Sequence, residues 1–302
     1  MIQIVDPHVH LFALEQGQYG WLQPQNPPFW PDKAKIQRTF TSQDLALCAP
    51  FTLNSYVHIE AGFDNQQPWR ELDYLEQQST TPSFRSIACC DLTLPSEDFI
   101  AQISALAAHP SFMGVRHILD EQALALLTSA QVLTNLRYLS EQGLIFEAQF
   151  DVNDSEVVEL IGELFAQNNQ ATNIATNIAK PLVNTWVINH VGLGAHNQQT
   201  YAQWLSNLQR LARIPQIKVK ASGWEMAQRD YSDEHVKQTI NILLEVWGEE
   251  RVMLASNFPL TLFSCEYQEY WQKVVDILAE LQLSQQTQRA LLSQNALLTY
   301  FI

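Results

Sequence analysis

Two histidines near the start of the chain, His8 and His10, are the first residues whose types and spacing suggest chemistry. They follow a β-branched run, and side chains two residues apart on an extended segment project to the same side. Two neutral imidazoles placed in this way can bind one cation. The alternative is a pair of hydrogen-bonded core histidines. Their position directly after an apolar run favours the functional interpretation.

Other polar side chains that could line the same site follow apolar runs further along the chain: Glu60, Asp91, Arg116, His117, Glu147, Gln149, His190, Lys220, Trp224 and Asn257. His190 precedes two glycines, which allow a loop to approach a ligand closely. An inward Arg116 would bind a carboxylate through two parallel hydrogen bonds, whereas an outward one would form a surface ion pair. Glu60 and Glu147 are the acidic candidates, and Trp224 would stack on a substrate or pack beneath a loop.

These residues need a scaffold that brings the ends of several strands together. Short β-branched runs occur at residues 2–5, 54–59, 84–90, 112–118, 144–150, 186–191, 217–221 and 252–255. Most are spaced by roughly 30 residues, the length of a strand and a crossover helix in a parallel sheet. Eight such units favour a (β/α)8 TIM barrel over a doubly wound sheet. The candidate residues would then meet at the carboxyl ends of the strands.

The segments between these runs are predicted to be helical. Ser96, Asp154 and Ser232 are predicted N-caps, and Pro68 suits the first turn of another helix. Residues 12–50 are rich in proline and aromatic residues, which predicts a long ordered loop over the mouth of the barrel. A short repeat within residues 168–180 is predicted to lengthen a connection on the opposite face. No linker divides the chain, so residues 1–302 are predicted to form one domain.

Composition limits the possible partners. Hydrophobic residues make up 46% of the chain and charged residues 16%, enough for a large core. The net charge of −15 argues against nucleic acid and membrane-surface partners and leaves a small-molecule substrate as the expected one. A homo-oligomer is compatible with the sequence. There is no secretory signal or long apolar run, so a cytoplasmic location is predicted.

Several motifs, in order along nearly the whole chain, resemble the lactonase branch of the amidohydrolase superfamily: DPHVHLF at 6–12, YGWLQ at 19–23, VHIEAG at 57–62, GVRHIL at 114–119, INHVG at 188–192, KASGWEM at 220–226 and ERVMLASNFPL at 250–260. That branch includes sugar-lactone, muconolactone-type and pyrone-dicarboxylate lactonases. The resemblance implies a deformed, metallo-dependent-hydrolase-like (β/α)8 barrel that hydrolyses C–O or C–N bonds of small carbonyl substrates. It matches His8 and His10 to the strand-one histidines of the family, and His190 to its strand-six histidine.

The chain departs from this family pattern at Asn257, where an aspartate that activates water is usual. An amide cannot act as a general base, so Asn257 can only orient water or substrate. Strand four also lacks a lysine that could be carbamylated, and strand five offers Glu147 and Gln149 instead of a histidine. The expectation is therefore one weakly held divalent ion such as zinc, bound mainly by His8 and His10, or catalysis without a metal.

The resulting hypothesis is hydrolysis of a lactone. His8 and His10 polarise the carbonyl, directly or through zinc, while Arg116 holds a substrate carboxylate. His117 and Trp224 are further candidates for substrate binding. A water molecule positioned by Asn257 loses its proton to His190 or Glu60. The alternatives are a binding barrel that has lost its general base, and a metal-dependent amidase or decarboxylase on the same fold.

Overall fold

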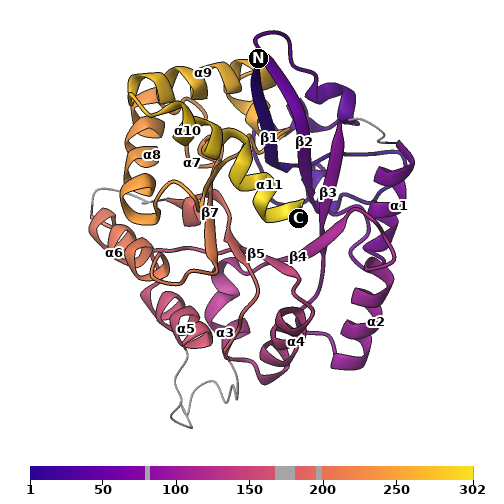
Figure 1. Cartoon of the computed structure of the whole chain (residues 1–302). Helices are drawn as coiled ribbons and strands as arrows, with labels where there is room; N and C mark the ends of the chain where they lie inside the picture. The colour runs from indigo at the N-terminus through magenta and orange to yellow at the C-terminus, as the bar shows by residue number, and fades with distance from the viewer. Residues whose placement is uncertain (79–81, 167–180, 195–198, 302) are drawn as a thin grey trace.

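Eight parallel strands in sequential order form the centre of the molecule (Figure 1). The computed structural model describes residues 1–78, 82–166, 181–194 and 199–301. The strands are β1 (Ile2–Val9), β2 (Phe51–Ile59), β3 (Ser83–Cys89), β4 (Phe112–Ile118), β5 (Ile145–Gln149), β6 (Trp186–Ile188), β7 (Ile217–Ala221) and β8 (Val252–Leu254). Each strand pairs with the next along the chain, which gives the nearly closed (β/α)8 barrel that the sequence predicts.

Helices surround the strands on the outside. The α-helices of the described residues are α1 (Trp69–Gln78), α2 (Ser96–Leu106), α3 (Ala123–Thr128), α4 (Ala130–Glu141), α5 (Ser155–Phe165), α6 (Tyr201–Leu211), α7 (Trp224–Ala227), α8 (Asp233–Trp247), α9 (Tyr267–Glu280), α10 (Gln285–Arg289) and α11 (Asn295–Tyr300). The short turns are η1 (Gly20–Leu22), η2 (Lys33–Ile36), η3 (Ser42–Leu45), η4 (Asp120–Gln122), η5 (His190–Leu193), η6 (Leu260–Phe263) and η7 (Ala290–Gln294), the last a π-helical turn.

The predicted helix starts are confirmed at two of three caps. The Asp154 side chain accepts hydrogen bonds from the backbone N–H groups at the start of α5, and Ser232 does the same for α8. Ser96 is the first residue of α2 instead of its cap, because Pro95 takes the N-cap position. The strand β1 also continues past its predicted end, so His8 lies within the strand.

The barrel closes between β1 and β8 through a side chain. The two strands share one bridge, Val9 with Phe258, and the backbone N–H of His10 donates to the Phe258 carbonyl at 2.6 Å. Just below, the buried Asp6 carboxylate accepts from the backbone N–H of Ser256 at 3.1 Å, from its hydroxyl at 2.5 Å and from the Tyr267 hydroxyl at 3.1 Å. Asp6 therefore supplies the cross-link that a longer β8 would have made with backbone groups.

The short helix α11 lies across one end of the barrel (Figure 1). Its residues Ala296 and Tyr300 pack with inward-facing residues of the strands: Val5, Val57, Ile59, Ile87, Ile145, Val187 and Met253. The Tyr300 hydroxyl reaches Glu147 inside the barrel, and Lys218 near the start of β7 donates to Thr299 at 2.8 Å. These contacts place α11 at the amino ends of the strands, so the opposite end remains for a site.

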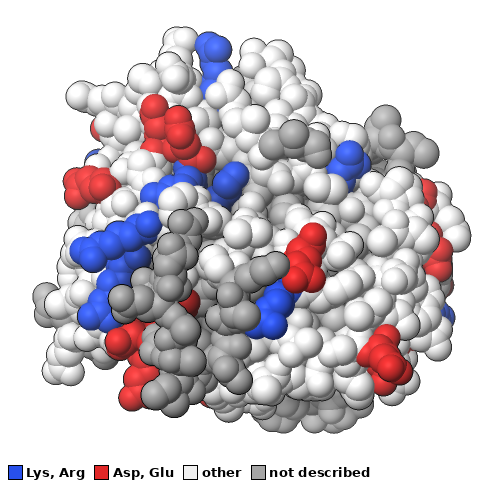
Figure 2. Space-filling model, turned by 60° about the horizontal axis from the view of Figure 1, so that its bottom comes forward, with Lys and Arg blue, Asp and Glu red and all other residues white. Residues whose placement is uncertain are grey.

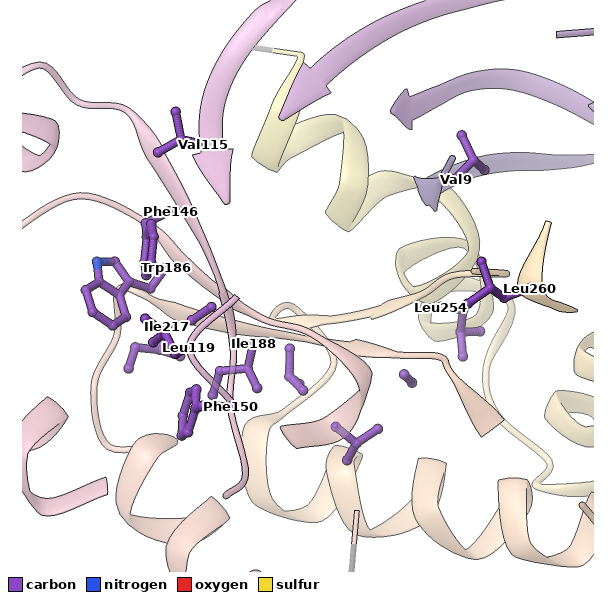
Figure 3. Packing of buried hydrophobic residues seen from close by; sticks show 14 of the residues in the cluster. Val9, Val115, Leu119, Phe146, Phe150, Trp186, Ile188, Ile217, Leu254 and Leu260 are labelled. Carbon is purple, nitrogen blue, oxygen red and sulfur yellow. The ribbon is translucent and has the colours of Figure 1, made fainter. Parts of the chain in front are cut away.

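The main hydrophobic cluster lies between the strands and the helices. Figure 3 shows Phe146 of β5 beside Trp186 of β6, and their ring centroids are 4.8 Å apart. Phe165 of α5 packs on the same indole with a centroid distance of 5.3 Å. Such edge-to-face aromatic contacts fix how α5 sits on the sheet. None of the described helices combines the length and the hydropathy that spanning a bilayer requires.

The connection between β1 and β2 is ordered, as its composition predicts. The buried Lys33 ammonium donates to the carbonyl oxygens of Trp21, Gln23 and Asn26 at 2.9, 3.2 and 2.8 Å. Asp32 forms an ion pair with Arg229, whose nitrogen lies 2.9 Å away, and this contact fastens the connection to the segment after α7. The predicted lengthening within residues 168–180 falls outside the described residues.

Charged side chains are sparse on the face shown in Figure 2. Some of the basic residues there lie close to acidic ones and others stand apart, and most of the described surface in this view is neither. The net charge of −15 is therefore not accompanied by a broad basic area on this face.

The closure of the barrel leads to the first prediction. Asp6→Ala should lower the free energy of unfolding by about 2–4 kcal/mol, because four buried donors, the backbone N–H of His8 among them, lose their acceptor. The measurement is equilibrium denaturation in urea. Asp276→Ala, on the exposed face of α9, is the control and should change stability by no more than about 0.5 kcal/mol. Equal, small effects of the two substitutions would mean that Asp6 does not hold the barrel closed.

Candidate active site

A cavity of about 1850 Å³ opens at the carboxyl ends of the strands. Its walls include His10, Glu60, Arg116, His190 and Asn257, which come from or follow five different strands. The β1–β2 connection contributes Trp21, Pro27, Pro28 and Trp30 to the same wall. The cavity is larger than most small-ligand pockets, which measure roughly 300–1,000 Å³.

His10 and His190 line this cavity, and the ring of the third predicted histidine, His8, packs against both of them. His8 is fully buried, with its ring centroid 5.0 Å from that of His10 and 4.7 Å from that of His190. The Nδ1 of His10 lies 2.8 Å from the Ile59 carbonyl oxygen, so it carries the proton and leaves Nε2 as an acceptor. His190 Nδ1 is 3.0 Å from the Ser222 hydroxyl. The cluster thus holds each ring in one orientation.

The imidazoles are neutral at neutral pH. Burial, and then the charge of Lys220, hold the pKa of His8 well below its usual range. Burial and Arg116 do the same to the pKa of His10. Burial lowers the pKa of His190 to about 3, with smaller contributions from the charges of Arg116 and Lys220. A neutral imidazole can accept a proton, and each added negative charge nearby would raise its pKa.

Arg116 faces inward, which answers the question that the sequence left open. Its Nε and Nη2 lie 2.7 and 2.6 Å from Glu60 Oε1, and Nη2 also donates to the Glu60 carbonyl oxygen at 2.9 Å. The partner carboxylate therefore comes from within the chain. His117 borders the cavity from a less buried position, with Nδ1 3.2 Å from the backbone nitrogen of Leu92. Trp224 is buried and also lines the cavity.

A second buried ion pair lies beneath His8. Lys220 Nζ is 2.6 Å from Glu147 Oε1 and 3.4 Å from His8 Nδ1, and all three side chains are fully buried. Glu147 also accepts hydrogen bonds from Asn189 and from Tyr300. Burial lowers the pKa of Lys220 to about 8, and Glu147 opposes that shift. The sequence placed Lys220 and Glu147 at strand ends, but it gave no reason to pair them.

Sequence reasoning missed Glu225, the residue that partners Asn257. Asn257 Nδ2 donates to Glu225 Oε1 at 2.5 Å, and both side chains are buried. Glu225 Oε2 and Asn257 Oδ1 have no hydrogen-bond partner among the described residues. Burial raises the pKa of Glu225 to about 7. The available signal was its place in the KASGWEM motif, one residue beyond Trp224.

Two segments of the site have left-handed backbone conformations: Asn257, and the turn that begins at His190. Asn257 has φ 58°, a value that asparagine tolerates better than most residues. His190, Val191, Gly192 and Leu193 have φ between 52° and 63°, a run that costs roughly 1–2 kcal/mol at each non-glycine position. The sequence suggested that the glycines after His190 allow a close approach to a ligand. Gly192 instead allows close contact with Val152 of the same chain. Such strain often occurs at functional sites.

The donor set does not fit a divalent ion held by His8 and His10. A metal-binding histidine normally donates its second N–H to a carboxylate or a carbonyl group, as His10 does. The second nitrogen of His8 faces the Lys220 ammonium instead, which has no lone pair. Among the described residues, no group of three or more His, Cys, Asp and Glu side chains is arranged to hold a metal ion.

Gly223 sets the position of His190, and this leads to a prediction. A Cβ on Gly223 would lie 2.5 Å from His190 Nδ1, so Gly223→Ala must displace the ring. We predict a loss of turnover of roughly 10²-fold, as for other small misplacements in active sites. Gly143→Ala is the matched control: its φ of 68° imposes the same strain, but a Cβ there meets nothing within 4 Å. Retained activity in Gly223→Ala would show that His190 tolerates displacement.

The Glu225 carboxyl predicts how stability depends on pH. Its pKa is about 7 in the folded protein against an ordinary 4.5, so the folded state holds this proton more tightly than the unfolded state. That contribution to stability is fully present below pH 4.5 and is lost as the pH rises through 7. Glu225→Gln, whose amide oxygen still accepts from Asn257, should remove about 3 kcal/mol of this decline. The test is the free energy of unfolding of both proteins from pH 4.5 to 8. Parallel curves would contradict it.

Comparisons with known proteins agree with this architecture. An uncharacterised protein of Sinorhizobium fredii, y4mH, is 23% identical over 99% of this chain and 98% of its own length. An L-fucono-1,5-lactonase of Burkholderia multivorans is 28% identical over 35% of this chain and 39% of its own length.

Solved structures of two proteins share the fold over nearly their full lengths. The crystal structure of an amidohydrolase from Burkholderia multivorans with bound HEPES has a TM-score of 0.76 at 18% identity, with 99% of each chain covered. A second crystal form of that protein contains zinc and has a TM-score of 0.74. A 2-pyrone-4,6-dicarboxylic acid hydrolase described for Pseudomonas putida has a TM-score of 0.66 at 18% identity, covering 100% of this chain and 98% of its own.

The sequence model of the amidohydrolase family matches residues 5–302, almost the whole chain. The eightfold barrel and the histidines at its carboxyl end agree with that match, and the chain belongs to the amidohydrolase family.

Proposed function

We propose that this hydrolase acts on a lactone or a closely related cyclic ester, and that it does so without a metal ion. The observation that carries the proposal is the group of three neutral histidines beside Arg116 and Asn257 at one cavity. Two relatives with lactone-hydrolysing names, the L-fucono-1,5-lactonase and the pyrone-dicarboxylic acid hydrolase, support this substrate class. A metal-dependent amidase or decarboxylase would need a firmly bound ion, which the donor set does not favour.

Arg116 gives the cavity a binding group for substrate anions. Its Nε and Nη2 are held by Glu60, whereas Nη1 has no hydrogen-bond partner among the described side chains. A substrate carboxylate would bind to this fixed guanidinium without an entropic cost for ordering it. The aromatic residues Trp21, Trp30 and Trp224 would cover an apolar face of the ring.

His190 is the proposed general base. It lines the cavity and is neutral, so it can take a proton from water as the water oxygen bonds to the lactone carbonyl carbon. The ring C–O bond then breaks, and the same proton passes from His190 to the departing oxygen, which gives a hydroxy acid. Glu60, the other candidate from the sequence, already accepts two N–H groups of Arg116 through Oε1.

Asn257 is proposed to hold the attacking water. Its Nδ2 is committed to Glu225, which leaves the unpartnered Oδ1 as an acceptor for one hydrogen of that water. Glu225 does not line the cavity and is proposed to act as a positioning residue through Asn257.

The test is a hydrolysis screen over sugar lactones and dicarboxylate lactones, with and without added zinc or manganese. We expect turnover that does not depend on metal. His190→Ala should lower it by roughly 10²–10⁴-fold, the usual contribution of a general base. Asn257→Ala should lower it by about 10²–10³-fold. His109→Gln, before β4 at the far end of the barrel, is the control. Turnover that requires metal in the wild type would contradict the metal-free reaction.

An exchange of the two groups at positions 257 and 225 tests the binding-protein alternative. In Asn257→Asp alone, two buried carboxyl groups would share one proton, which weakens both as bases. The double variant Asn257→Asp/Glu225→Gln keeps one acid and one amide but moves the acid to the cavity wall. If the wild type is inert on every lactone and the double variant turns one over, the wild type is a binding protein that lacks its base.

A further inference from the structure

Lys220 lies where its charge controls the proton of His8. The ammonium is 2.6 Å from Glu147 Oε1 and 3.4 Å from His8 Nδ1, in a region from which solvent is excluded. An ammonium group can only donate hydrogen bonds, so the nitrogen that it faces must be the acceptor. The neutral imidazole of His8 then carries its proton on Nε2.

The opposite arrangement holds for the neighbouring ring. His10 donates from Nδ1 to the Ile59 carbonyl oxygen and keeps a lone pair on Nε2. His8 Nε2 is buried and has no hydrogen-bond partner among the described residues. An N–H group left unpaired in a buried site costs free energy that a ligand oxygen would recover. The two strand-one histidines are therefore not equivalent: one accepts and the other donates.

We infer that the buried Lys220–Glu147 pair fixes His8 as an Nε2–H donor, so that the histidine cluster binds a substrate oxygen and excludes a divalent cation. Lys220 is a positioning residue, and its charge takes the place of a metal ion in polarising the site through His8. That the bound oxygen belongs to a lactone carbonyl rests on the proposed function. The tautomer of His8 and the exclusion of metal do not.

The direct test needs no substrate. Long-range ¹H–¹⁵N correlation spectra of the metal-free protein, labelled at histidine, report which ring nitrogen carries the proton. His8→Gln serves to assign the signals. We expect His8 protonated at Nε2 and His10 protonated at Nδ1. Protonation of His8 at Nδ1 would overturn the inference, whatever the protein proves to hydrolyse.

The second test is a zinc titration against a chromophoric chelator. Lys220→Gln/Glu147→Gln removes both charges together. The amide oxygen that this change introduces in place of the ammonium can accept a hydrogen bond from a protonated His8 Nδ1, which leaves the lone pair of Nε2 for a metal. We expect the double variant to bind zinc at least 10-fold more tightly than the wild type, the size of effect usual for the orienting partners of metal ligands.

Lys273→Gln/Glu269→Gln, a surface ion pair of α9 with a 3.2 Å contact, is the matched control and should leave zinc affinity unchanged. One tightly bound zinc per wild-type chain, lost in His8→Gln and unaffected by the change at 220 and 147, would overturn the inference. If the double variant fails to fold, the wild-type spectra and the wild-type zinc titration still decide it.

Discussion

The buried pair of Lys220 and Glu147 connects two strands of the barrel, β5 and β7, with His8 of β1 and with the helix α11. Glu147 of β5 binds Lys220 of β7, Asn189 after β6 and Tyr300 of α11. Burying two charges costs several kcal/mol each, which only good geometry and further hydrogen bonds offset. Here those bonds come from the helix that closes the amino end of the barrel. The packing of α11 and the protonation of His8 thus depend on the same carboxylate.

Two of the buried carboxylates at the site are paired with a buried cation, and a third is not. Glu60 pairs with Arg116, and Glu147 with Lys220. The Glu225 carboxyl group has only the amide of Asn257 as its hydrogen-bond partner among the described residues. Burial raises the pKa of Glu225 to about 7. Burial lowers the pKa values of His8, His10 and His190, and the charges of Lys220 and Arg116 lower them further. Each of the two buried cations of the site is thus balanced by a carboxylate of its own chain.

The sequence was sufficient for the fold because strand and helix patterns are local. The runs at 112–118 and 217–221 became strands with the same bounds. The meeting of His8, His10, His190 and Asn257 follows from the eightfold order, since all parallel strands end on one side. The pairing of Lys220 with His8, 212 residues apart, does not, because it depends on strand tilt and rotamers. Glu225 escaped notice for the same reason: its partner is set by the left-handed backbone of Asn257.

The neighbouring Glu225 explains why position 257 carries an amide. A carboxylate there would lie about as close to Glu225 as the present 2.5 Å contact, and two such groups cannot both be ionised. An amide removes that conflict, because its N–H satisfies the carboxyl group while its oxygen stays free. The titratable carboxyl group of this pair is therefore Glu225, which follows β7 and does not line the cavity, and the residue after β8 is the amide Asn257. In the proposed reaction the base is then His190, which its strained turn holds against Ser222 and Gly223.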